Sequence, residues 1–128
     1  MAFKDLREFI DTLDKTGDVV HIKQEVDWDL EVGAIGRRAY ERQAPADLFE
    51  RIKDYPEGFR PFGGSLGTFR RVAIAMGLDP ETPVKGLYAE YERRINQPMS
   101  TFYNCITACK QNIIVGDDVD LYSLPTPY

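Results

Sequence analysis

The sequence predicts an α/β fold, a small mixed sheet flanked by helices in a single domain. Short runs rich in β-branched residues alternate with longer segments whose apolar residues recur every three or four positions. Of the 128 residues, 43% are hydrophobic and 29% are charged, which is typical of a globular protein with one core. Because both patterns recur along the chain, we expect a sheet packed against helices.

The first predicted elements are a helix over residues 3–16 and a strand over residues 19–22. The helix has apolar residues at i, i+3, i+4 and i+7, the spacing of one helix face: Leu6, Phe9, Ile10 and Leu13. Gly17 is expected to end it, because glycine adopts the left-handed conformation at little cost. The strand is the short β-branched run that contains His21.

A second helix is predicted from about Leu30 to Gln43. Asp27 and Asp29 are candidate N-caps, and a carboxylate at Glu31 suits the helix dipole. The residues expected to be buried are Val32, Ile35 and Ala39. Gly33 and Gly36 would each cost about 1 kcal/mol relative to alanine, which suggests close backbone packing.

Extended pieces follow Pro45, which ends the second helix. We expect a strand over residues 48–53, a turn at 55–58 and another short extended piece at 59–62.

Two further helices are predicted in the second half of the chain. Residues 63–67, which are rich in glycine, lead into a helix over 68–76 that ends at Gly77. Its expected buried face consists of Phe69, Val72, Ala73 and Met76. Thr82 and Pro83 are the start signal of the next helix, with threonine as the cap and proline at the first helical position. That helix stops before Pro98 and carries an apolar row: Val84, Leu87, Tyr88, Tyr91 and Ile95.

The last thirty residues show a different pattern. Residues 98–109 have no clear period, residues 109–115 predict a strand, and residues 116–118 predict a tight turn. The chain ends in Pro-Thr-Pro-Tyr, which is typical of a connector. We therefore expect a domain over residues 1–116 and a connector over 117–128 that leads toward a further domain.

Charge and composition exclude several classes of protein. The formal net charge of −5 argues against nucleic-acid binding, which needs a basic face. No apolar run approaches the ~20 residues that span a bilayer, so we expect no membrane association. The N-terminus lacks the layout of a signal peptide, so a cytoplasmic location is expected. Cys105 and Cys109 cannot build a disulfide framework, and they suit a reducing compartment.

Candidate chemical residues each have a structural alternative. His21 is the only histidine, which excludes a histidine-rich zinc site, and a structural role is the simpler interpretation. Cys105 and Cys109 form one C-x3-C pair without further ligands. Three aspartates close together could hold Ca²⁺ or Mg²⁺, or could simply close an Asp-rich turn: Asp117, Asp118 and Asp120.

Two basic pairs and the glycine-rich segment are equally open to interpretation. Residues 63–67 precede a helix as phosphate-binding loops do, but they match no nucleotide-binding motif. A tight connection capped by Ser65 or Thr68 explains them without a ligand. The arginines are expected on polar helix faces, either solvated or in interface salt bridges: Arg70, Arg71, Arg93 and Arg94.

Several motifs follow one another in a recognisable order along the chain. The most specific are Gly-Asp-Asp-Val-Asp-Leu at residues 116–121 and Leu-Pro-Thr-Pro at 124–127. The others are residues 5–10, 17–20, 25–31, 34–35, 37–38, 45–50, 64–73 and 109–115. In this order the motifs resemble the N-terminal part of UbiD-family decarboxylases. Two positions depart from the family pattern: Asp47 replaces a usual apolar residue, and Ala108 stands where proline commonly precedes Cys109.

The resemblance implies reversible, non-oxidative decarboxylation of aromatic or α,β-unsaturated carboxylic acids. It implies prenylated FMN, Mn²⁺ and K⁺ as cofactors of the full-length enzyme, which would form a homo-oligomer. It also implies partners for this chain, namely the flavin-binding split β-barrel and the C-terminal domain. The family's Glu-Arg-Glu network and its metal ligands all follow the 116–121 block, so no catalytic, cofactor-binding or metal residue is assigned in this chain.

Two hypotheses about function remain. In the first, this chain is the structural N-terminal domain of a UbiD-like enzyme and neither binds flavin nor decarboxylates alone. In the second, it is a stand-alone accessory or binding subunit that docks onto a separate catalytic chain, with exposed aromatics such as Tyr122 and Tyr128 at the contact. A small independent enzyme that uses Asp117, Asp118 and His21 would lack a supporting constellation.

Overall fold

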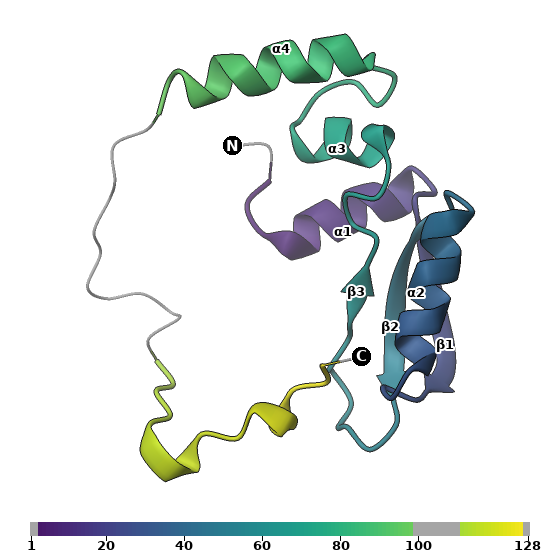
Figure 1. The fold of residues 1–128 in the computed structure, drawn as a ribbon, viewed down its shortest axis with the longest axis vertical. Coiled ribbons are helices and arrows are strands. Elements are labelled where there is room, and N and C mark those ends of the chain that lie inside the picture. Colours follow the sequence, from purple (N-terminus) through teal and green to yellow (C-terminus); the bar gives the residue numbers. More distant parts are fainter. Residues whose placement is uncertain (1–2, 99–110, 127–128) are drawn as a thin grey trace.

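The computed structural model describes residues 3–98 and 111–126, and it forms an α/β core with an extended C-terminal segment (Figure 1). The helices are α1 (Leu6–Lys15), α2 (Glu31–Glu41), α3 (Phe69–Ala75) and α4 (Val84–Ile95). The strands are β1 (Val19–Val26), β2 (Ala46–Ile52) and β3 (Phe62–Gly63). Two 3₁₀ turns follow, η2 (Gly116–Asp118) and η3 (Leu121–Ser123).

The three strands form one mixed sheet in the order β1-β2-β3. β1 and β2 are parallel, with Val19 opposite Ala46 and Ile22 opposite Phe49, and β2 pairs antiparallel with β3. Parallel neighbours need a crossover connection, and α2 supplies it. The prediction of a small mixed sheet flanked by helices is therefore confirmed.

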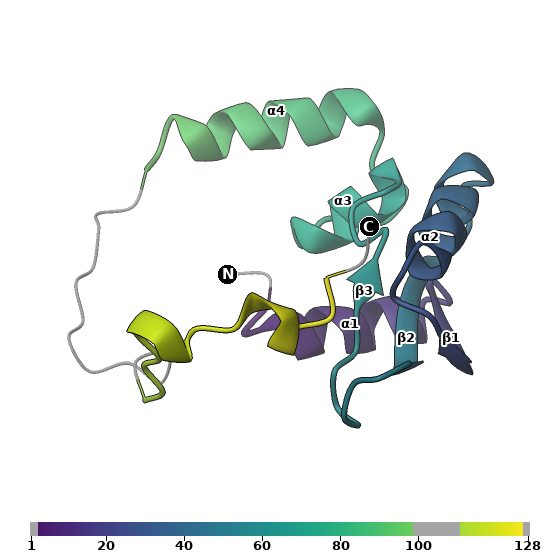
Figure 2. The same cartoon turned by 60° about the horizontal axis from the view of Figure 1, so that its bottom comes forward.

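Helices cover both faces of this sheet (Figure 2). On one face, α2 packs over a cluster formed by Val26, Val32, Phe49 and Ile52. On the other face, α1 and α3 meet in a second cluster formed by Phe9, Leu13 and Ile74. β2 lies between the two clusters, which is why four successive residues from Ala46 to Phe49 are buried.

The predicted first helix and its end at Gly17 are confirmed, and the structure adds an N-cap at Asp5 that was not predicted. The Asp5 carboxylate accepts a hydrogen bond from the Glu8 amide at 3.0 Å. At the other end Gly17 has φ +74°, and the Asp18 amide donates to the Leu13 carbonyl at 2.8 Å. Phe9 and Leu13 are buried as predicted, whereas Leu6 is exposed.

Two predicted N-caps are wrong. At α2 the cap position is Leu30, with φ +65°, and neither Asp27 nor Asp29 caps the helix with its side chain. Instead the Glu31 carboxylate accepts from the Asp27 amide at 2.8 Å, so the carboxylate bonds backward into the loop. At α4 the cap position is Pro83, and the Thr82 hydroxyl donates to the Asp79 carbonyl at 2.6 Å, inside the preceding turn.

The predicted C-terminal strand is also wrong for its described part. Residues 111–115 are exposed and belong to no strand, because no partner strand lies beside them within the part of the chain that the structure describes. Of the predicted extended piece at 59–62, only Phe62 joins the sheet. The tight turn at 116–118 is confirmed as η2, with Gly116 at φ +66°. Among the described helices, none has the length and apolarity needed to cross a bilayer.

Candidate functional site

His21 lies in β1 between carboxylates from two other elements. Its Nδ1 is 2.6 Å from Glu50 Oε1 on β2, and its Nε2 is 3.3 Å from Asp14 Oδ1 on α1. The hydrogen bond with Glu50 raises the pKa of His21, with Asp14 adding to it, and the same bond lowers the pKa of Glu50. The two ring nitrogens point in opposite directions, so the carboxylates do not converge on a common point. His21 therefore acts as a polar link between α1 and the sheet.

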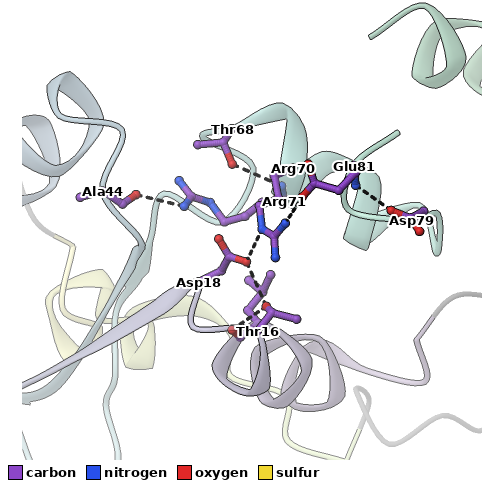
Figure 3. A network of polar contacts seen from close by, with 9 residues as sticks. Thr16, Asp18, Ala44, Thr68, Arg70, Arg71, Asp79 and Glu81 are labelled. Atoms are coloured by element: carbon purple, nitrogen blue, oxygen red, sulfur yellow. Dashed lines mark hydrogen bonds and ion pairs between the residues drawn. The ribbon is translucent and has the colours of Figure 1, made fainter. Parts of the chain in front are cut away.

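Arg70 and Arg71, which the sequence places on a polar face, are both used inside the fold (Figure 3). Arg70 Nε is 3.0 Å from Asp18 Oδ2, and its guanidinium also pairs with Glu81. Arg71 is 3% exposed and donates from Nη1 to the Ala44 carbonyl at 3.0 Å. The expectation of a solvated face is wrong for Arg71, because its side chain is buried and bonds the connection between α2 and β2 at Ala44.

The glycine-rich segment before α3 packs against a buried carboxylate. Asp47 is 2% exposed, and burial raises its pKa, while burial lowers the pKa of Arg71. A Cβ at Gly63 would collide with the Asp47 carboxylate, with Cγ at 2.9 Å, and a Cβ at Gly67 would lie 2.9 Å from Arg71 Nη2. The glycines thus allow the backbone to approach these two side chains, which supports the structural interpretation of residues 63–67.

The remaining candidate residues do not converge on a reactive centre in the described ranges. Asp117 and Asp118 lie in η2, and Asp120 Oδ1 accepts from the Tyr122 amide at 2.9 Å, as an Asp-rich turn predicts. Arg93 and Arg94 both bind Glu90 at 2.7 Å, and Arg94 also donates to the Met76 carbonyl. Cys105, Cys109 and Tyr128 lie outside the described residues.

Among the described residues, no group of side chains fits the cofactors that the resemblance implies. Over residues 3–98 and 111–126, no three His, Cys, Asp or Glu side chains are grouped so that they could hold a metal ion. Arg70 is paired with Asp18 and Glu81, and Arg71 is buried with Nη1 bonded to the Ala44 carbonyl, whereas a flavin phosphate would need arginines that it can reach.

An apolar groove between α3 and α4 is the first of two exposed surfaces. It has a volume of about 350 Å³ and is lined only by apolar and aromatic side chains: Phe69, Val72, Met76, Val84, Leu87, Tyr88 and Tyr91. Leu87 is buried, but Tyr88 and Tyr91 are 66% and 57% exposed. The predicted buried face of α3 is thus wrong in part, because Phe69 is 62% exposed at the edge of this groove.

The second exposed surface is the strap, which we define as residues 113–124. Its apolar side chains are open to solvent: Ile113, Ile114, Val115, Val119, Leu121, Tyr122 and Leu124. Tyr55 Oη contacts the strap, with the Tyr122 carbonyl at 2.8 Å and the Leu124 carbonyl at 3.3 Å. Sequence reasoning predicted exposure of Tyr122, which is 83% exposed, but missed Tyr55 and the groove. The row of tyrosines on α4 was the available signal for the groove.

Comparison with known proteins identifies the family. Residues 10–91 match the UbiD N-terminal domain, described as the 3-octaprenyl-4-hydroxybenzoate carboxy-lyase N-terminal domain. The chain belongs to the UbiD family. Ferulic acid decarboxylase 1 of Saccharomyces cerevisiae is 35% identical over 97% of this chain and 27% of that protein. Pyrrole-2-carboxylic acid decarboxylase of Pseudomonas aeruginosa is 34% identical over 96% of this chain and 26% of that protein. The chain therefore spans about a quarter of the length of these relatives.

Solved UbiD-class structures contain the same fold. The vanillic acid decarboxylase of Sedimentibacter hydroxybenzoicus in closed form matches 94% of this chain and 26% of that chain, with a TM-score of 0.78 and 31% identity. Its open form matches 71% of this chain and 19% of that chain, with a TM-score of 0.66 and 33% identity. A UbiD-class enzyme of Pelotomaculum thermopropionicum, solved with prFMN, matches 98% of this chain and 28% of that chain, with a TM-score of 0.68 and 25% identity.

Proposed function

We propose that this chain is the N-terminal structural domain of a prFMN-dependent decarboxylase that acts on aromatic or α,β-unsaturated carboxylic acids. Residues 1–116 form the domain and residues 117–128 the connector toward the flavin-binding part. The relatives support the substrate class, since they are named for ferulic, pyrrole-2-carboxylic and vanillic acids. The role is to shape and shield the active-site region, while the rest of the enzyme supplies cofactor, metal ions and proton transfer.

The observation that carries this proposal is the apolar surface that the chain leaves exposed. Tyr88 and Tyr91 on α4 are 66% and 57% exposed, and Ile113 and Leu121 on the strap are 73% and 75% exposed. Exposed apolar residues grouped in this way mark interaction sites in soluble proteins. The remaining three quarters of a UbiD-type enzyme is the partner that this surface fits, because each relative carries the same domain within a longer chain.

The accessory-subunit hypothesis uses the same surface with the partner on a separate chain. Both arrangements place the apolar side chains against a flavin-binding domain, and they differ in covalent connection alone. The experiment below therefore includes one arm with the two parts joined and one arm with them mixed.

A chimera tests the proposal. The N-terminal part of the S. cerevisiae ferulic acid decarboxylase that matches this chain is replaced by this chain, and the protein is loaded with prFMN. We expect flavin absorbance to survive desalting and CO₂ to be released from ferulic acid, whereas the same enzyme without its N-terminal part does neither. Mixing this chain with that shortened enzyme restores activity if covalent connection is unnecessary.

Two controls test whether activity depends on the exposed apolar surface and not only on the presence of the domain. A chimera with Leu121→Asp and Tyr88→Ser replaces two exposed apolar side chains without touching either core cluster, so it should fold but lose flavin retention and turnover. The isolated chain should retain no flavin colour and release no CO₂. Turnover by the isolated chain, or full activity of the substituted chimera, contradicts the proposal.

A further inference from the structure

The hydrogen bonds that join the strap to the described core come from one side chain, Tyr55. Within residues 3–98 and 111–126, the two hydrogen bonds between them both start at Tyr55 Oη, which lies 2.8 Å from the Tyr122 carbonyl and 3.3 Å from the Leu124 carbonyl. A phenol has one proton to donate, so the two carbonyls share it. Trp28, Tyr55 and Phe59 line a cavity of about 560 Å³ together with Tyr122 and Ser123.

The core side of this contact is held by packing that does not involve the strap. Tyr55 makes an edge-to-face contact with Trp28, with ring centroids 6.3 Å apart, and a tilted contact with Phe59 at 6.2 Å. Both Trp28 and Tyr55 pack against the cluster of Val26, Val32, Phe49 and Ile52. The Tyr55 hydroxyl is therefore held in place by packing.

The strap contributes backbone carbonyls to this contact, and the turn η3 holds them in position. Asp120 closes η3 by accepting from the Tyr122 amide at 2.9 Å, and the Ser123 hydroxyl donates to the Asp120 carbonyl at 2.7 Å. Leu121 and Tyr122 are 75% and 83% exposed, so their side chains add little to the contact. One shared hydrogen bond at an exposed site is readily exchanged for water, so the strap can leave without disturbing either core cluster.

We propose that Trp28, Tyr55 and Phe59 form a docking site from which the strap is released and to which it returns, with the Tyr55 hydroxyl as its latch. The strap contains most of the connector, so the docked strap fixes the path of the chain toward the flavin-binding part. This role rests on the proposed function. The closed and open forms of the Sedimentibacter enzyme match 94% and 71% of this chain, so the two forms of that relative differ in how much of this fold they share.

The single tryptophan makes the docked state measurable in the isolated chain. Ser123→Cys is introduced with Cys105→Ser and Cys109→Ser, and the new thiol is labelled with a nitroxide, which quenches a nearby indole. Because Ser123 and Trp28 line the same cavity, the docked strap quenches Trp28 emission. Tyr55→Phe removes only the hydroxyl, and Tyr40→Phe, at a 65% exposed tyrosine on α2, is the matched control.

We expect Tyr55→Phe to lower the ratio of docked to released strap about three- to tenfold, the effect of losing one hydrogen bond. Circular dichroism and the urea midpoint should match the natural chain, and Tyr40→Phe should leave quenching unchanged. If Tyr55→Phe fails to fold, Asp120→Ala weakens the same contact from the strap side and should give the same loss. Absence of quenching in the natural background, or equal quenching in the Tyr55→Phe and Tyr40→Phe chains, overturns the proposal. Neither result depends on a flavin-binding partner, so failure here leaves the chimera experiment intact.

Discussion

At Asp47 a carboxylate is buried where the sheet, α2 and the segment before α3 meet. A Cβ at Gly63 would collide with its oxygens, whereas a Cβ at Gly64 or Gly36 would lie 3.5 Å or 3.7 Å from one of them. The charge of Arg71 lowers the pKa of Asp47, against the effect of burial. A buried carboxylate is costly unless neighbouring charges and dipoles offset the lost hydration. Glycine at position 63 lets the backbone lie close to the carboxylate, since any side chain there would displace it.

Gly63→Ala should destabilise the fold by about 1–3 kcal/mol, the usual cost of overpacking a core. The cause is steric, so combining it with Asp47→Ala should recover much of the loss. Gly36→Ala is the matched control: its Cβ would lie 3.7 Å from Asp47 Oδ2, an ordinary contact, and it should be neutral or stabilising by up to about 1 kcal/mol. Urea unfolding of the natural chain, the two single glycine variants and the double variant measures these differences. Equal effects at Gly63 and Gly36 would count against the steric explanation.

His21 predicts a pH dependence of stability. Its folded pKa lies above its unfolded value of 6.5 because Glu50 and Asp14 favour the protonated ring. The resulting stabilisation is fully present below pH 6.5 and is lost as the pH rises through the raised folded pKa. His21→Gln should therefore flatten the fall in unfolding free energy above pH 6.5. Thermal or urea unfolding at several pH values checks this, with Arg60 and Glu50 left unchanged. If the free energy of unfolding fell with pH equally in the variant and the natural chain, the assignment to His21 would be disproved.

Among the elements, α4 buries one side chain of its apolar row and leaves the other four exposed. It meets the rest of the described fold through α3, where Leu87 is 5% exposed, and Arg94 bonds the Met76 carbonyl at 2.7 Å. Its other apolar side chains stay open, as do those of the strap. The spacing of apolar residues predicts helices correctly but does not say which apolar face finds a partner within the same chain.

Leu87→Ala should detach α4 at a cost of about 2–4 kcal/mol, because it removes the side chain that anchors the helix. Limited proteolysis should then cut the connection between α3 and α4 faster, while the sheet stays protected. Tyr91→Ala, at a 57% exposed site on the same helix, should change stability by about 0.5 kcal/mol or less. Equal protease sensitivity in both variants would show that α4 is not anchored at Leu87.

For the molecule as a whole, both core clusters are enclosed, whereas the apolar side chains on α4 and the strap are exposed. Val26, Val32, Phe49 and Ile52 close one face of the sheet, and Phe9, Leu13 and Ile74 close the other. The chain can thus fold around its sheet and still present apolar surface to a larger assembly. This division explains how a domain that spans about a quarter of its relatives keeps the same fold.

The isolated chain should self-associate weakly at high concentration through these open surfaces, since exposed apolar patches promote association. Tyr91→Ser combined with Ile95→Ser should reduce association, measured by sedimentation, without lowering the urea midpoint. Both side chains are more than half exposed, so their loss costs the folded chain little. Unchanged sedimentation would mean that the α4 face is not the surface involved.

The local elements and the family can be read from the amino-acid sequence alone. Apolar periodicity located α1, α2, α3 and α4, glycines marked the ends of α1 and α3, and the ordered motifs pointed to the UbiD family, because these signals depend on neighbours along the chain. The tertiary structure decided which polar groups became buried or paired: Asp47 and Arg71 are enclosed, and His21 is linked to Glu50, 29 residues away. It also decided that residues 111–115 form no strand, since a strand exists only when a partner backbone lies beside it. Such pairings join residues far apart in the chain, and a linear pattern carries no information about which distant groups will meet.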